Sequence, residues 1–138
     1  MYEPEEHAAA LGLDVIDLDP QQGRLGLYIP RLRAIIIKPD LHPHDRRTVL
    51  AHEIRHHETG TRHTYTGREE QLRVEHDCDR VAAQRLIPFP ALADEVAGSA
   101  DPGLWAMSLR VNGRMIRARL RSLTPGEREL LDTIHLDP

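Results

Sequence analysis

The sequence predicts an α+β fold of 138 residues, in which a small three-stranded sheet is followed by two long helices and a C-terminal helical segment. Three short apolar runs, separated by proline and glycine, predict the strands. From Pro43 onward the apolar residues recur at helical spacing, which predicts helices. We expect residues 1–90 to form the core and residues 91–138 to form a helical extension packed on it.

The first third of the chain is expected to hold one short helix and the three strands. Residues 7–11 are rich in alanine and end before Gly12, which predicts a helix. Residues 13–18 and 25–29 mix apolar and other residues in the alternating manner of strands. Residues 34–37 are entirely apolar and end before a proline, and we expect the third strand there.

Two long helices are predicted by their end signals. The first covers residues 43–59, because proline suits the first turn of a helix and Gly60 is a natural stop. The second covers about residues 68–86, before Pro88. On one face of the second helix Glu75 and Asp79 stand among apolar residues that include Leu72, a costly arrangement unless a positive group meets the two carboxylates.

Composition excludes several classes of protein. A formal net charge of −4 argues against a protein that binds duplex DNA. The single cysteine, Cys78, can form neither an intramolecular disulfide nor a four-cysteine zinc site. No run approaches the roughly 18 apolar residues of a membrane helix. We therefore expect a cytoplasmic protein without a membrane partner or direct contact to nucleic acid; the sequence does not indicate an oligomeric state.

The first long helix carries the pattern His-Glu-x-x-His. Two histidines four residues apart, His52 and His56, share a helical face and can converge on one Zn²⁺. Glu53 then lies beside the open coordination position, where it can act as general base. His57 falls on the neighbouring arc with apolar residues, so we expect a packed, hydrogen-bonded histidine there rather than a ligand.

The expected third ligand is Glu75, with Asp79 one turn later accepting the ring N–H of a ligating histidine. The alternative is that both carboxylates belong to a solvated acidic stripe next to arginines of the same helix. The connection at residues 60–67 holds His63 and Tyr65, either of which could stabilise the oxyanion of a tetrahedral intermediate or be an ordinary loop residue.

The chain resembles the ImmA/IrrE family of small zinc peptidases. The resemblance rests on residues 46–57 (RRTVLAHEIRHH) and 75–88 (EHDCDRVAAQRLIP), and it extends over about residues 7–90. It implies a zincin-like fold with His52, His56 and Glu75 as zinc ligands and Glu53 as the catalytic glutamate. It also implies limited cleavage of a helix-turn-helix repressor.

The chain departs from the family pattern at Cys78, where the family usually has alanine. We expect a small buried side chain, and the alternative is a regulatory thiol that ligates the metal.

The last third of the chain predicts short helices joined by tight turns, a layout that resembles helix-turn-helix. Its basic residues could form a docking surface for an acidic partner or for DNA, or the helices could be a solvated cap on the core. These basic residues are Arg110, Arg114, Arg117, Arg119 and Arg121.

The sequence therefore favours a zinc-dependent endopeptidase that makes a limited cut in a helix-turn-helix repressor and relieves repression. The alternative is a non-cleaving antirepressor that binds the repressor on the same scaffold, and Glu53 discriminates the two because a binder needs no base beside the metal. Mn²⁺ or Fe²⁺ could replace Zn²⁺. We expect the substrate segment to add to an exposed sheet edge at residues 34–37.

Overall fold

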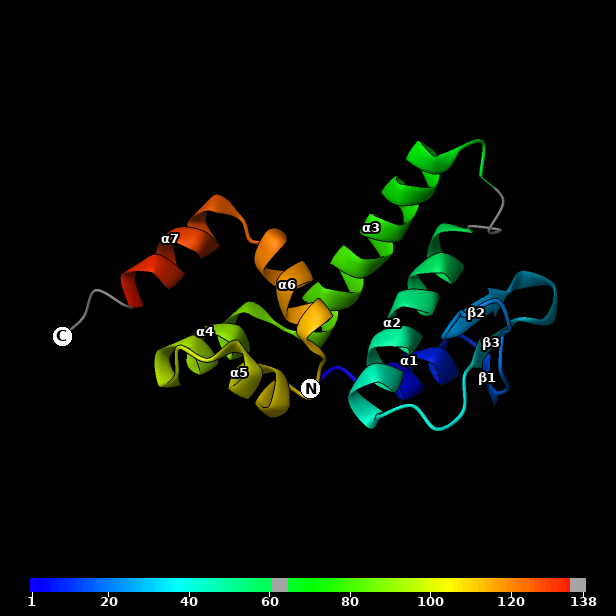
Figure 1. Cartoon of the computed structure of the whole chain (residues 1–138), viewed down its shortest axis with the longest axis horizontal. Helices are drawn as coiled ribbons and strands as arrows, with labels where there is room; N and C mark the ends of the chain where they lie inside the picture. Colours follow the sequence, from blue (N-terminus) through cyan, green and yellow to red (C-terminus); the bar gives the residue numbers. More distant parts are fainter. Residues whose placement is uncertain (61–64, 135–138) are drawn as a thin grey trace.

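The computed structural model describes residues 1–60 and 65–134. These residues contain seven α-helices and one three-stranded sheet. Figure 1 shows the sheet and the C-terminal helices on opposite sides of the long helices α2 and α3. The fold is α+β, as predicted. The elements are α1 (Pro4–Ala10), β1 (Asp14–Asp17), β2 (Gly26–Ile29), β3 (Ala34–Ile37), α2 (Pro43–Thr59), α3 (Arg68–Leu86), α4 (Phe89–Gly98), α5 (Pro102–Leu109), α6 (Gly113–Arg121) and α7 (Pro125–Ile134).

The sheet has the order β1-β3-β2, so the prediction that residues 34–37 form the substrate-binding edge is wrong. β1 pairs with β3 in parallel and β2 pairs with β3 antiparallel. β3 is central because it is apolar at all four positions, and Ala34, Ile35 and Ile37 are at most 2% exposed. The edges of the sheet are β1 and β2.

Helix α2 has the predicted bounds. Pro43 occupies its first turn, and His42 Nδ1 accepts a hydrogen bond from the backbone N–H of His44 over 3.0 Å, which caps the helix. The helix ends at Gly60, whose φ of 71° lies in the left-handed region that favours glycine. Its core-facing side buries Leu50 completely against the sheet.

His57 packs as predicted. Its Nδ1 lies 2.8 Å from the hydroxyl oxygen of Tyr28 on β2, and the two rings meet edge to face. This contact fixes α2 against the sheet one residue after His56, so packing sets the position of the predicted metal ligands relative to β2.

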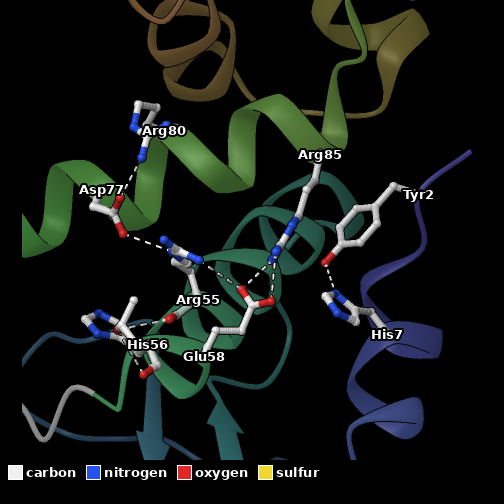
Figure 2. Close-up of polar contacts among 9 residues, drawn as sticks. Tyr2, His7, Arg55, His56, Glu58, Asp77, Arg80 and Arg85 are labelled. Carbon is white, nitrogen blue, oxygen red and sulfur yellow. Dashed lines mark hydrogen bonds and ion pairs between the residues drawn. The ribbon is translucent and has the colours of Figure 1, made fainter.

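Helix α3 also has the predicted bounds and lies alongside α2. Figure 2 shows two ion pairs that join the helices. Arg85 donates two hydrogen bonds to Glu58, at 2.7 and 2.8 Å, and Arg55 donates one to Asp77 at 3.0 Å. Leu72, expected on the buried face of α3, is 42% exposed, because it lies on the first turns of the helix, beyond the main core.

The C-terminal helices share a hydrophobic core with α2 and α3. Ala51 and Ala82 belong to the same buried cluster as Leu92, Met115 and Leu131. The division of the chain at residue 90 stays a prediction. None of the helices among the described residues is long and apolar enough to cross a membrane.

Candidate metal centre

Helices α2 and α3 bring the three predicted ligands together. His52 and His56 lie one turn apart on α2, with ring centroids 5.0 Å from each other. Glu75, on the neighbouring α3, places one carboxylate oxygen 2.8 Å from His52 Nε2 and the other 3.2 Å from His56 Nε2. Two imidazole nitrogens and a carboxylate therefore converge on one point, which is the donor set of a divalent-cation site. Their role as ligands stays a prediction.

Asp79 contacts one of the two predicted ligand histidines, His52. His52 donates a hydrogen bond from Nδ1 to Asp79 Oδ1 over 2.7 Å, which fixes the orientation of the ring and leaves Nε2 directed toward Glu75. Burial lowers the pKa of His52, but the hydrogen bonds to Asp79 and Glu75 outweigh it and raise the pKa to about 9. Glu75 and Asp79 both contact His52, and their side chains are 34% and 13% exposed.

Glu53 is a buried carboxylate beside the two imidazoles, with 5% of its surface exposed. Its Oε2 has no hydrogen-bond partner within residues 1–60 and 65–134. Burial raises the pKa of Glu53 above its usual value, and the neighbouring imidazoles oppose that rise. A carboxylate with a raised pKa and a free oxygen is suited to accept a proton from a nearby water molecule.

Tyr65 reaches the same site from the connection between α2 and α3. Its hydroxyl donates a hydrogen bond to Glu75 Oε1 over 3.2 Å. Burial, together with the charge of Glu75, raises the pKa of Tyr65 to about 12, so the phenol keeps its proton at neutral pH and remains a donor. Its oxyanion role stays a prediction, and His63 lies outside the described residues.

The site opens into a cleft of about 710 Å³. It is lined by Gly26 and Leu27 of strand β2 and by His52, Glu53 and Glu75 of the site. The sheet edge that accompanies the cleft is therefore β2, two strands away from β1. Sequence reasoning missed this because it assigned the edge to the strand directly before the histidine helix.

Cys78 is fully buried, as expected, one turn after Glu75. Its Sγ and one ring nitrogen each of His52 and His56 all lie within 4.8 Å of one another. Burial and the nearby charge of Glu75 raise the pKa of the Cys78 thiol. Cys78 is therefore close enough to be considered as a further donor, and thiolate ligation stays the alternative.

Sequence reasoning also missed Arg114, which comes from helix α6. Arg114 Nη2 contacts both oxygens of Asp79, at 2.9 and 2.7 Å, and the side chain lines the cleft. The sequence marks residues 110–121 as basic but contains no signal for which carboxylate each arginine meets. Arg119 of the same group is 4% exposed and donates to the carbonyl oxygen of Ile87, so it belongs to the core rather than to a docking surface.

A comparison with protein families finds one match. Residues 8–121 match the family described as Peptidase_M78, the IrrE N-terminal-like domain, and the match includes both helices of the site and helix α6. No curated protein matches the chain. Since the match covers most of the sequence, the chain belongs to the IrrE N-terminal-like family of metallopeptidase domains.

Proposed function

We propose that the protein is a zinc-dependent endopeptidase that makes a limited cut in a helix-turn-helix repressor. The observation that carries the proposal is the convergence of His52, His56 and Glu75 next to the buried carboxylate of Glu53 in an open cleft. The family membership supports peptide-bond hydrolysis, and the resemblance to ImmA/IrrE peptidases supports a repressor as substrate.

The donor set fits a divalent cation. Two neutral imidazole nitrogens and one carboxylate are a ligand set of catalytic zinc sites, and Mn²⁺ or Fe²⁺ accepts the same donors. When bound, such a cation polarises the scissile carbonyl and lowers the pKa of a water molecule. His52, His56 and Glu75 would hold it, with Asp79 fixing the ring of His52.

Glu53 performs the proton transfers in the proposed reaction. Its free Oε2 takes a proton from the attacking water and then delivers a proton to the leaving amine. Tyr65 retains its phenolic proton and can donate a hydrogen bond to the developing oxyanion. Proton transfer of this kind contributes roughly 10²- to 10⁴-fold to a reaction rate.

The substrate segment binds along β2 in this proposal. β2 pairs with β3 on one side only and borders the cleft at Gly26 and Leu27, so an extended peptide can add there, next to the point where the backbone of Tyr28 is hydrogen-bonded to Glu53. Leu27 of that strand lines the same cleft as Glu53. This arrangement replaces the expectation that residues 34–37 receive the substrate.

The proposal is tested with Glu53→Gln. The variant is incubated with helix-turn-helix repressors encoded near the gene, and metal content, repressor binding and cleavage are measured. We expect cleavage to fall at least 10²-fold while metal content and binding stay unchanged. Glu58→Gln is the matched control, because Glu58 lies on the same helix and pairs with Arg85 rather than with the site. Relief of repression by Glu53→Gln would favour the non-cleaving antirepressor instead.

A further inference from the structure

We infer that Arg114 is a positioning residue of the metal centre, acting through Asp79 on His52, so that helix α6 completes the site. The inference rests on the metal site of the proposed function, but it makes no assumption about the substrate. It assigns a role to a residue outside the two helices that carry the ligands.

The chain of contacts is continuous. Arg114 Nη2 donates to both oxygens of Asp79, at 2.9 and 2.7 Å, and His52 Nδ1 donates to Asp79 Oδ1 at 2.7 Å. The opposite nitrogen of the ring, Nε2, lies 2.8 Å from Glu75. A carboxylate held by one partner alone can rotate about its terminal torsion, which is a soft one. Contact with Arg114 fixes the plane of the Asp79 carboxylate, and that plane sets the direction of the His52 ring.

The two partners of this ion pair, Asp79 and Arg114, differ in how far they are exposed to solvent. The side chain of Asp79 is 13% exposed, whereas that of Arg114 is 53% exposed. The Asp79 carboxylate therefore depends on Arg114 for charge compensation on its solvent side. The Arg114 guanidinium is hydrated by water whether or not it makes this contact. Replacing Arg114 changes the surroundings of Asp79 far more than it changes the core.

Helix α6 is held in place independently of Arg114. Asn112 caps the helix by accepting from the backbone N–H of Met115 at 3.0 Å and donates through Nδ2 to Asp45 on the first turn of α2 at 2.9 Å. The next residues on the inner face, Met115 and Ile116, are at most 2% exposed. Arg114 is thus presented to Asp79 by a helix whose start is anchored to the histidine helix itself.

The experiment compares zinc affinity in three variants of the full chain. The dissociation constant for Zn²⁺ is measured by competition with a chelator of known affinity, and the folding of the metal-free protein is checked by circular dichroism. We expect Arg114→Gln to weaken zinc binding about 10- to 100-fold, as loss of a contact behind a metal ligand does. Arg114→Lys should recover part of the loss, because an ammonium group can still donate to Asp79. Arg117→Gln, one turn later on the same exposed face, should bind zinc like the wild type.

A double variant checks the route. In an Asp79→Asn background the loss caused by Arg114→Gln should shrink severalfold, because the residue through which Arg114 acts has been altered. Wild-type zinc affinity in Arg114→Gln, or an undiminished loss in the Asp79→Asn background, overturns the inference. Because no variant is scored by cleavage, a chain that binds zinc but cuts no repressor would contradict the proposed function and leave this result standing.

Discussion

Replacing Gly26 by alanine tests how strand β2 is seated on the histidine helix. A Cβ at this position would overlap Cγ1 of Val49 and approach Cγ of Glu53 to 3.2 Å. Val49 is branched at Cβ, so its side chain has few alternative rotamers. Alanine at position 26 therefore forces β2 away from α2 or forces Val49 into a strained rotamer.

The expected cost follows from this overlap. Inserting one methyl group into a well-packed contact costs about 1–3 kcal/mol of unfolding free energy. The measurement is urea unfolding followed by circular dichroism. Gly98→Ala is the control, because a Cβ there meets nothing within 4 Å, and its unfolding free energy should stay at the wild-type value or rise by up to about 1 kcal/mol, since alanine favours the helix.

A second substitution isolates the contact. Val49→Ala removes the atom that the new Cβ would strike, so the Gly26→Ala and Val49→Ala substitutions together should cost less than the sum of the two single costs, by roughly 1 kcal/mol or more. Additive costs, or a Gly26→Ala protein as stable as the Gly98→Ala control, would refute the close approach of β2 to α2.

Two further predictions concern the polar contacts that hold the helices together. Arg119→Met keeps most of the side-chain volume but leaves the carbonyl oxygen of Ile87 without its buried donor, and we expect a loss of about 1–3 kcal/mol in urea unfolding. Burial raises the pKa of Glu58, but the contacts with Arg85 outweigh burial and lower this pKa overall. The ion pair therefore stabilises the fold above the unfolded pKa of about 4.3, and this stabilisation is lost as the pH falls through the lower folded pKa. Glu58→Gln should therefore lower the unfolding free energy by at most about 1 kcal/mol near neutral pH and by nothing in strong acid, which unfolding curves across pH can check.

The long helices and their site residues could be predicted because their signals are local. Pro43 and Gly60 delimit α2, and the four-residue spacing of His52 and His56 requires only a helix. Glu75 and Asp79 stand out because carboxylates are costly on a face that packs against another helix. In each case a few neighbouring residues contain the information.

The sheet order and the contribution of α6 depend on contacts between distant segments. Residues 34–37 are apolar throughout, a pattern of strands covered on both faces, and that signal could have indicated a central strand. No local signal links Arg114 to Asp79, because the arginine has neighbours of the same kind and only the packing of α6 selects it. Leu72 looked like part of the buried stripe because helical spacing does not show where a neighbouring helix stops covering it.

X-ray absorption at the zinc edge of the zinc-loaded protein tests the central claim most directly. The account predicts a first shell of nitrogen and oxygen donors only, at about 2.0–2.1 Å, with two imidazoles, one carboxylate and one exchangeable oxygen. A sulfur donor at about 2.3 Å would mean that Cys78 closes the shell, and with no position left for water the hydrolytic mechanism would be contradicted.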